Sequence, residues 1–569
     1  MRASWLCVVV LGCGTTGTKK PGTSVDTADS VDSGATVEAG GPAMVAATSG
    51  AEAIAAGLAV LDEGGHAVDA ALTVANVQIV RSMGSWNSFA GIMGMVVYDA
   101  ETGEVTSLHG NYATFVGETD PATIPAGPSG RTALVPGYMA TAEAAHAAYG
   151  VLPWSRTLEP AIELAETGFA LDALFAGYLT YKEALLRRRP ETEALFTDAD
   201  GNLLEEGDVF RQPALAETLR SVSTDGAAYM YTGAWADRFV AAVQEEGGRV
   251  EAADLAGYSP DWLTPLEGTY AGARVVTLGT REFGGVQILE GLHMAEAMDL
   301  AALGPWWESG EAMYRLARIT QVNQLWTYLY DYNPDYERYV TDAFPGVTLD
   351  HAARVDPAQG ALMADYVDDG TFAEFAELLG LGVSSVSHSD AIVVVDRAGN
   401  AVALTHTINT TLWGDTGIFV DGVSVPDSAS FQQDLLDEVA PGGKVPTPLN
   451  CLVALRDGRL VLTASTIGNV HYAQLQRTHA VLGLGMSPED AVQAPMVEGA
   501  LFSELVARGA VDAAVLEEAA ALGTPIAESS ASTFPAWVGI SVADDGGLAG
   551  GAEPFLEAIG GGVGALPAQ

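Results

Sequence analysis

Residues 387–396 read SHSDAIVVVD, and this stretch decides how the rest of the chain is interpreted. A short polar cluster with two serines runs directly into an apolar, β-branched run that ends at Asp396. The turn sequence RAGN follows at 397–400, and a second apolar run extends from 401 to 408. Two β-rich runs joined by a short loop containing Gly and Asn predict a β-hairpin.

The predicted hairpin places a serine hydroxyl at an open strand end. If Asp396 pairs with Ala401, Ser389 lies opposite Ile408, and residues 407 and 409 lie on either side of Ile408. A hydroxyl within reach of a second hydroxyl and an amide is a candidate nucleophile. The competing interpretation is an ordinary turn, because Ser and Asp hydrogen-bond to their own backbone before strands.

The composition indicates a globular chain with a strongly acidic surface. Of the 569 residues 48% are hydrophobic, and 73 acidic residues outweigh 26 basic ones to give a formal net charge of −47. Such a surface repels phosphate backbones, so we expect no nucleic-acid partner. It suits a protein kept soluble in a salty or extracellular medium.

The sequence lacks the common metal and cofactor motifs. Cys7, Cys13 and Cys451 form neither a disulfide framework nor a CxxC pair for zinc. Residues 12–17, GCGTTG, match the GxGxxG fingerprint, but no βαβ pattern surrounds them and we treat the match as accidental. The HExxH zinc motif and the GxSxG elbow of serine hydrolases are absent. We therefore expect no metal and no cofactor.

The first 41 residues predict an export signal and a tether. Residues 1–13 combine Arg2, a short apolar stretch and Gly12 before Cys13, which is typical of a lipoprotein signal in which Cys13 is lipidated. This segment is too short to span a bilayer. Residues 14–41 have almost no large apolar side chains and predict a disordered tether. We expect a periplasmic or cell-surface lipoprotein, or a secreted protein.

The remaining chain, from 42 to 569, predicts one folding unit. A helical pattern from Ala51 to Val80 is interrupted at Gly64. Further helical patterns cover 138–149, 159–167, 173–188, 213–246 and 310–333, and strand-like runs lie at 95–99, 105–108, 274–278, 452–456 and 459–464. Helices flanking bundled strands favour a layered α/β or α+β body, and no internal repeat is found.

Several segments in a fixed order point to one family. They are EGGHAVDAA at 63–71, VPG at 135–137, YGVLPW at 149–154, FGGV at 283–286 and VVDRAGNAV at 394–402. They resemble segments of the γ-glutamyltransferase (glutathione hydrolase) family of N-terminal-nucleophile hydrolases. The resemblance implies a four-layer αββα sandwich, made as one precursor that cuts itself into two subunits.

The resemblance also implies where the precursor is cut. In the family, a hydroxyl residue becomes the new N-terminus of the small subunit, and its position here is Ser389. The His388–Ser389 bond is therefore the implied cleavage site, with a large subunit at 42–388 and a small subunit at 389–569. Ser387, one strand pitch upstream, is the rival nucleophile.

A residue in the position of Ser389 would supply both nucleophile and base. Cutting the bond after His388 frees an α-amine with a reference pKa of about 7.7–8.0, which can take the hydroxyl proton near neutral pH. By resemblance, Thr407 takes the place of a hydroxyl that supports the nucleophile, and Asn409 that of an amide that contacts substrate. Both positions also suit an ordinary strand end.

The implied substrate pocket departs from the family pattern. The backbone donors for the oxyanion align on Ile467 and Gly468, which keep one glycine of the family's two. The family's acidic pair and Gln, which bind the substrate amino group, correspond approximately to Asp427 and Ser430. The arginine that clamps the substrate carboxylate has no counterpart in 108–113.

Three functions remain open. The first is a self-processing hydrolase or transferase that acts on γ-glutamyl or related small amides, with water or an amine as acceptor. The second is an acylase with a different acyl donor, which the missing arginine favours. The third is an inactive surface lipoprotein that retains the fold.

Overall fold

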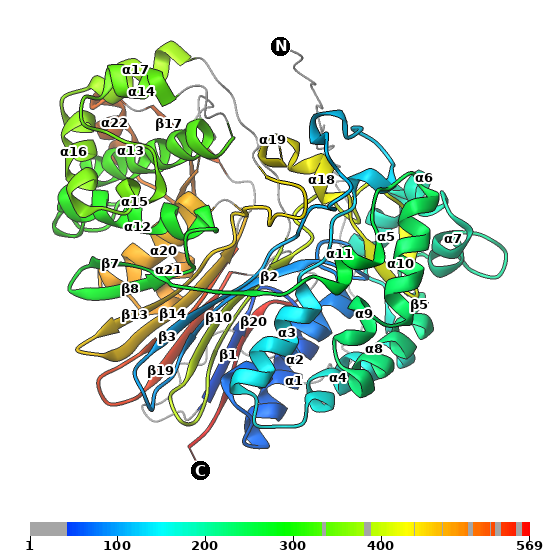
Figure 1. Cartoon of the computed structure of the whole chain (residues 1–569). Coiled ribbons are helices and arrows are strands. Elements are labelled where there is room, and N and C mark those ends of the chain that lie inside the picture. Colours follow the sequence, from blue (N-terminus) through cyan, green and yellow to red (C-terminus); the bar gives the residue numbers. More distant parts are fainter. Residues whose placement is uncertain are drawn as a thin grey trace, which may run out of the picture. The chain divides into compact units, whose positions relative to one another are not determined.

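The computed structural model describes residues 43–332, 337–379, 389–436, 439–468, 470–498, 505–523, 525–529, 536–553 and 560–568. These residues belong to one compact unit, Thr36–Gln569. Within them, two antiparallel sheets lie face to face, and helices cover the outer face of each sheet (Figure 1). The expected four-layer αββα sandwich is confirmed.

The first sheet carries the predicted hairpin at its centre. Its strand order is β20-β1-β9-β10-β2-β3-β6, and all neighbours pair antiparallel. The strands are β1 (Ala43–Ala47), β2 (Ile92–Tyr98), β3 (Val105–Gly110), β6 (Asp261–Leu263), β9 (Asp390–Val395), β10 (Ala401–Thr407) and β20 (Gly562–Leu566). Strand β9 therefore lies between two neighbours, with both its faces covered.

The second sheet packs against the first through small side chains. Its order is β19-β18-β14-β13-β8-β7. The strands are β7 (Leu266–Tyr270), β8 (Ala273–Thr277), β13 (Cys451–Arg456), β14 (Arg459–Ile467), β18 (Ala536–Val542) and β19 (Leu548–Ala552). Ala391, Ala403 and Cys451 belong to the core between the sheets. Because these side chains are small, β14 approaches β9 and β10 closely.

Short strands lie outside the two main sheets. They are β4 (Phe169–Ala170) with β5 (Val209–Phe210), β11 (Ile418–Val420) with β12 (Val423–Val425), and β15 (Met496–Glu498) with β16 (Leu505–Arg508) and β17 (Ile526–Ser529).

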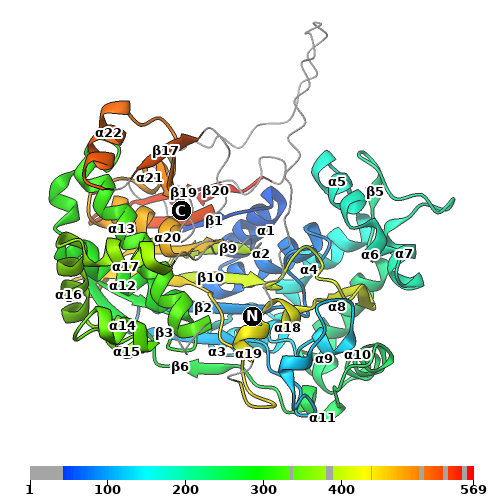
Figure 2. The same ribbon diagram turned by 90° about the horizontal axis from the view of Figure 1, so that it is seen from above.

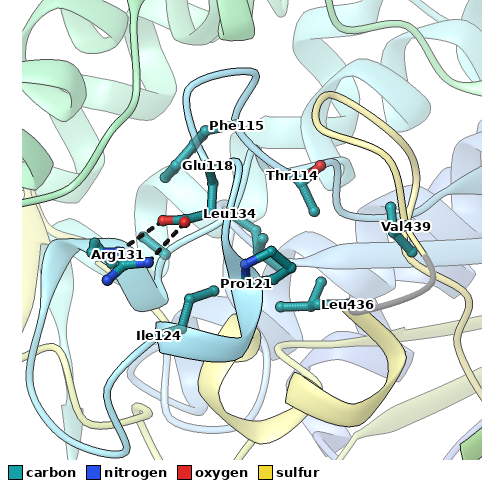
Figure 3. A pocket seen from close by; sticks show the side chains of 10 residues that line it. Thr114, Phe115, Glu118, Pro121, Ile124, Arg131, Leu134, Leu436 and Val439 are labelled. Carbon is teal, nitrogen blue, oxygen red and sulfur yellow. Dashed lines mark hydrogen bonds and ion pairs between the residues drawn. The ribbon is translucent and has the colours of Figure 1, made fainter.

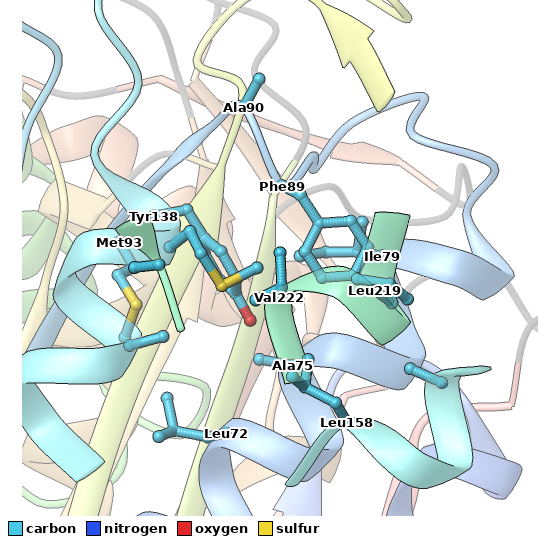
Figure 4. Packing of buried hydrophobic residues seen from close by; sticks show 14 of the residues in the cluster. Leu72, Ala75, Ile79, Phe89, Ala90, Met93, Tyr138, Leu158, Leu219 and Val222 are labelled. Carbon is cyan, nitrogen blue, oxygen red and sulfur yellow. The ribbon is translucent and has the colours of Figure 1, made fainter. Parts of the chain in front are cut away.

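Helices α1 and α2 cover the outer face of the first sheet, and α4 and α8 lie outside them (Figure 1). The helices of this side are α1 (Ala51–Asp62), α2 (Ala67–Arg81), α3 (Tyr138–Tyr149), α4 (Trp154–Thr167), α8 (Pro213–Asp225), α9 (Ala228–Tyr231), α10 (Ala234–Glu245) and α11 (Ala252–Ala256). Leu72, Ala75 and Ile79 of α2 pack near Leu158 and Leu219 (Figure 4). Helix α2 is buried nearly all round because it lies between the sheet and α4.

A second helical layer covers the other sheet, as the view from above shows (Figure 2). It contains α12 (Phe283–Ala297), α13 (Gly310–Thr327), α14 (Glu337–Ala343), α15 (His351–Arg354), α16 (Pro357–Asp368), α17 (Thr371–Leu379), α20 (Val470–Leu482), α21 (Pro488–Gln493) and α22 (Ala513–Ala521). The remaining short helices are α5 (Ala173–Tyr181), α6 (Glu183–Leu186), α7 (Pro190–Phe196), α18 (Ser428–Phe431) and α19 (Gln433–Leu436).

Some predicted helices have different limits in the structure. The pattern at 213–246 divides into α8, α9 and α10, because Gly226 turns the chain with φ +72°. The predicted start at 159 is wrong, since Pro160 lies inside α4. The first turn of α4 is held by Trp154, whose indole N–H donates to the carbonyl of Val222 at 3.0 Å.

The central hairpin pairs one residue away from the predicted register. Val395, and not Asp396, faces Ala401. The N–H of Asp396 donates to the carbonyl of Asn400 at 3.0 Å, so the loop has three residues between them. Gly399 adopts φ +88°, as the last position of a three-residue hairpin loop requires. The Asp396 carboxylate caps this loop by accepting the N–H of Asn400 at 3.0 Å.

A buried ion pair joins three helices of the second helical layer. The guanidinium of Arg354 donates to both carboxylate oxygens of Glu290 at 2.9 Å and to Thr327 Oγ1 at 2.9 Å. Arg354 is fully buried and Glu290 is 2% exposed. The pair links α12 to α15, and Thr327 adds a contact to α13; removal of one charged partner alone from such a buried pair is strongly destabilising.

Substitution Arg354→Met should lower the free energy of unfolding by about 3–5 kcal/mol, because it leaves the Glu290 carboxylate buried without a cation. The double variant Arg354→Met/Glu290→Leu should recover most of this loss. Arg274→Met breaks an exposed pair with Glu267 and should cost about 0.2–1 kcal/mol. Urea unfolding of the three variants checks this, and equal losses for Arg354→Met and Arg274→Met would contradict it.

Candidate active site

Ser389 immediately precedes β9 and is buried, with 6% of its surface exposed. The last pair of the β9–β10 ladder joins Asp390 to His406, so the ladder continues with Thr407 beside Ser389. The predicted position opposite Ile408 is therefore wrong, by the same one-residue shift as the hairpin loop. The candidate cleavage partner His388 and the rival Ser387 lie outside the described residues.

The corrected register brings the two predicted hydroxyls onto one face. Residues directly opposite each other in an antiparallel ladder point to the same side of the sheet. Ala391 and Val393, which alternate with Asp390 along β9, belong to the core between the sheets. Ser389 and Thr407 therefore project toward the second sheet.

Thr407 and Asn409 shape the chain where it leaves β10. Thr407 Oγ1 accepts the N–H of Asn409 at 2.9 Å. Asn409 adopts φ +49°, a left-handed conformation that Asn tolerates better than most residues. Between them, Ile408 donates its N–H to the carbonyl of Trp86 and accepts the hydroxyl of Tyr112. This strand end is therefore rigidly held.

Asp427 immediately precedes α18 and Ser430 lies within it, and this part of the chain contacts the segment that follows β10. Thr410 Oγ1 donates to Asp427 Oδ1 at 2.7 Å, and the hydroxyl of Ser428 donates to the carbonyl of Ile408 at 2.7 Å. Burial raises the pKa of Asp427. Ser430 is half-buried, and its N–H donates to the carbonyl of Asp427. The Asp427 carboxylate therefore already has a hydrogen-bond partner within the protein, the hydroxyl of Thr410.

The predicted oxyanion donors lie on the opposite sheet. Ile467 is the last residue of β14, which packs against β9, and Gly468 follows with φ +79°. Asn450 holds this strand end: it donates to the carbonyl of Thr466 at 2.9 Å and accepts the N–H of Thr466 at 3.2 Å. The structure therefore fixes the backbone that leads into Gly468.

A polar cluster between the sheets was not predicted from sequence. The hydroxyls of Thr405 and Ser465 lie 2.6 Å apart, and Thr405 also donates to the carbonyl of Asn450 at 2.8 Å. Cys451 is adjacent to this cluster, and burial raises the pKa of its thiol to about 12. Cys451 therefore stays protonated and is a poor nucleophile.

Asp390 is a further residue that the sequence interpretation missed. It is fully buried, and its carboxylate accepts hydrogen bonds from the side chains of Thr48, Ser49, Trp86 and Asn87. Burial raises its pKa to about 6. An acidic residue leading an otherwise apolar buried strand is a signal that the sequence offered, because buried carboxylates require partners.

A hollow lies between the loop that follows β3 and α19 (Figure 3). Its volume is about 10 Å³, which suits a single water and no substrate. Arg131 lines it, and its guanidinium donates to both carboxylate oxygens of Glu118, at 2.9 and 2.8 Å. This arginine is already paired, so it does not replace the carboxylate clamp that 108–113 lacks.

The described residues contain no group of three or more His, Cys, Asp or Glu side chains arranged to hold a metal ion. None of the described helices is long and apolar enough to cross a membrane.

Gly91 sits where the loop after α2 touches β10. A Cβ at this position would lie 2.6 Å from the carbonyl oxygen of Thr407. The carbonyl of Gly91 accepts the N–H groups of Gly137 and Tyr138 at 2.9 Å, so the loop is held from the other side as well. Only glycine fits without moving the strand end that carries Thr407.

Substitution Gly91→Ala should lower the free energy of unfolding by about 1–3 kcal/mol, because the added methyl meets backbone that cannot move freely. Gly177→Ala is the matched control, since Gly177 lies in α5 and, apart from its chain neighbours and the helix's own backbone, no atom lies within 4 Å of the added methyl. It should stabilise the protein by about 0.5–1 kcal/mol. Thermal unfolding of both variants checks the contrast, and a neutral Gly91→Ala would refute the tight fit.

Comparison with known proteins finds similarity over most of the chain. A family model described as gamma-glutamyltranspeptidase matches residues 53–560. The chain is 27% identical to the glutathione hydrolase proenzyme of Escherichia coli strain K12, over 90% of each protein. It is 26% identical to the acylase ACY 1 proenzyme of Pseudomonas sp. strain SE83, over 78% of this chain and 80% of that protein.

A solved structure supports the fold. The crystal structure of cephalosporin acylase from Bacillus halodurans is similar to this chain, with a TM-score of 0.76 over 96% of this chain and 99% of that one. The sequence identity is 19%, so this likeness bears on the fold alone.

Proposed function

The chain belongs to the γ-glutamyltranspeptidase family and is an enzyme of that type, and from this premise we propose that it cuts itself before Ser389. The new N-terminal serine then hydrolyses or transfers the acyl group of γ-glutamyl or related small amides. The observation that carries the proposal is the pairing of β9 with β10. It sets Ser389 beside Thr407, at the strand end that faces β14.

The cut begins with attack of Ser389 Oγ on the carbonyl carbon of His388. The C–N bond of that peptide breaks as the new C–O ester bond forms, and the proton moves to the nitrogen. Water then hydrolyses the ester, which restores the hydroxyl and leaves a free α-amine on Ser389. The products are a large chain that ends at 388 and a small chain that begins at 389.

Turnover uses the same atoms in a second reaction. The α-amine, with a reference pKa of about 7.7–8.0, takes the proton of Ser389 Oγ as this oxygen attacks the substrate amide. Backbone N–H groups near Ile467 and Gly468 stabilise the oxyanion, and each such donor is worth about 3–4 kcal/mol. The amine product leaves, and water or a second amine releases the acyl group.

The contacts around α18 and the lack of an arginine in 108–113 favour acyl donors that lack the free α-amino and α-carboxylate groups of a γ-glutamyl residue. Asp427 binds Thr410, Ser430 corresponds approximately to one of the family residues that bind the substrate amino group, and no arginine lies in 108–113. The likeness to an acylase proenzyme, at 26% identity, is close to the likeness to a glutathione hydrolase proenzyme at 27%. An acylase with a non-γ-glutamyl donor is therefore the second candidate.

The proposed maturation includes export. Residues 1–13 act as the signal, Cys13 is the lipidated residue of an anchored form, and 14–41 form the tether. The large subunit then spans 42–388 and the small subunit 389–569. An acidic surface with a net charge of −47 suits such an environment.

Purified wild-type protein should run as two chains on a denaturing gel, whereas Ser389→Ala should stay whole because it lacks the attacking oxygen. Activity should fall by on the order of 10⁴–10⁶-fold in that variant. Ser387→Ala is the matched control and should cut normally, and the small chain should begin SDAIVVV. A first residue other than Ser389, or full activity in uncut protein, would overturn the proposal.

Assays on two anilides should separate the two candidate acyl donors. Because residues 108–113 contain no arginine for the substrate carboxylate, kcat/KM for γ-glutamyl anilide should be no higher than for a simple acyl anilide of equal length. One charged hydrogen bond is worth about 1.5–3 kcal/mol, or roughly 10–100-fold in this ratio. A preference of that size for the γ-glutamyl substrate would contradict the acylase alternative.

A further inference from the structure

We propose that Asp390 is a positioning residue for Ser389. Its carboxylate is held on the helix side of the first sheet, and this anchor fixes the direction in which the Ser389 hydroxyl projects on the other side. The inference deepens the proposed function and rests on it.

The Asp390 carboxylate uses all of its acceptor capacity. Oδ1 accepts the hydroxyls of Thr48 at 3.0 Å and Ser49 at 2.6 Å. Oδ2 accepts the indole N–H of Trp86 at 2.8 Å and the amide of Asn87 at 2.6 Å. An ionised carboxylate offers about four such sites, so the ionised form satisfies every donor.

The four donors come from two segments that converge on the start of β9. Thr48 and Ser49 belong to the turn between β1 and α1, and the other two donors belong to the loop after α2. Ala391 N donates to Thr48 Oγ1 at 2.9 Å, and Thr48 N donates to the carbonyl of Ala391 at 3.0 Å. The backbone on the C-terminal side of Asp390 is therefore clamped as well.

The same loop also reaches the neighbour of Ser389. The carbonyl of Trp86 accepts the N–H of Ile408 at 3.0 Å and lies 3.5 Å from Thr407 Oγ1. The loop after α2 thus holds β9 through the Asp390 carboxylate and the end of β10 through the carbonyl of Trp86. Successive side chains of a strand point to opposite faces, so a rotation of Asp390 would turn Ser389 away from the second sheet.

The hydrogen-bond partners of Asp390 are all neutral. The titratable group nearest in the ladder is His406, whose Nε2 lies 2.9 Å from Gln78 Oε1. Gln78 Nε2 in turn donates to Ser49 Oγ at 3.3 Å. Burial lowers the pKa of His406 to about 3, so the ring carries no charge near neutral pH. Neither the β1–α1 turn nor the loop after α2 places a titratable side chain on this carboxylate.

Protonation would break part of the network. A neutral carboxyl group turns an O–H toward donors that already point at it, and at least one hydrogen bond is lost. Burial raises the pKa of Asp390 to about 6, so the anchor is complete above this pH and weakens as the pH falls through it. In the uncut precursor Ser389 has no free amine, so its α-amine does not add to this pH dependence.

The test uses full-length precursor made in a cell-free translation, with self-cleavage followed on gels from pH 5 to 8. Asp390→Asn keeps the size of the side chain but directs an NH₂ group at existing donors. It should slow cleavage by about 10²-fold, as expected for a misplaced nucleophile, and should lose the wild-type decline centred near pH 6. In any mature enzyme that forms, kcat should fall while KM stays the same.

Two further variants keep the test decisive. Glu290→Gln makes the same change at a buried carboxylate of the second helical layer, and it should destabilise the protein without changing the cleavage rate or its pH profile. Ser49→Ala removes one donor and should shift the decline to higher pH, because fewer hydrogen bonds then favour the charged form. This variant remains informative if Asp390→Asn does not fold.

The inference is overturned if Asp390→Asn cleaves at the wild-type rate, or if Ser49→Ala leaves the pH profile unmoved. It is also overturned if Glu290→Gln reproduces the effects of Asp390→Asn, since the cause is then general destabilisation. Failure of the proposed function is recognised separately: Ser389→Ala then still cuts, or uncut protein is active, and the role of Asp390 falls with it.

Discussion

Strand β9 pairs with β1 on one side and with β10 on the other, and this pairing sets the geometry of the candidate site. It joins residues near the start of the described chain to a hairpin far along the sequence, and β20 extends the same sheet beyond β1. A strand paired on both sides and covered on both faces has one workable register, because a shift of one residue exchanges its two faces. The side on which Ser389 projects follows from that register.

Buried polar groups reinforce this arrangement in different ways on the two sides of the sandwich. In the second helical layer, Glu290 is neutralised by Arg354, which also pairs with Asp331, and removal of Arg354 leaves the buried Glu290 carboxylate without its cation. At the start of β9, Asp390 is held by four neutral donors and no cation. The first arrangement stabilises helix packing, and the second makes the geometry of one strand sensitive to proton concentration.

The candidate chemistry needs contributions from both sheets. The first sheet supplies Ser389 and Thr407 at neighbouring strand ends, and the second supplies the backbone after β14. The close approach of the sheets follows from small residues such as Ala391 and Cys451 between them. The residues expected to surround the substrate acyl group match the family pattern less well than those around the proposed cleavage site. Asp427, for example, already accepts a hydrogen bond from Thr410.

Residue patterns alone were enough to identify the types of the segments, their order and the family, because helices and strands leave periodic patterns and the family segments recur in order. It also indicated the hydroxyl residue that leads the central strand. The hairpin register could be read only from the folded chain, in which Val395 faces Ala401 and the Asp396 carboxylate accepts the N–H of Asn400. The partners of Asp390 lie more than 300 positions away in the chain, and no local pattern specifies such contacts. Packing of distant segments, and not local propensity, selects them.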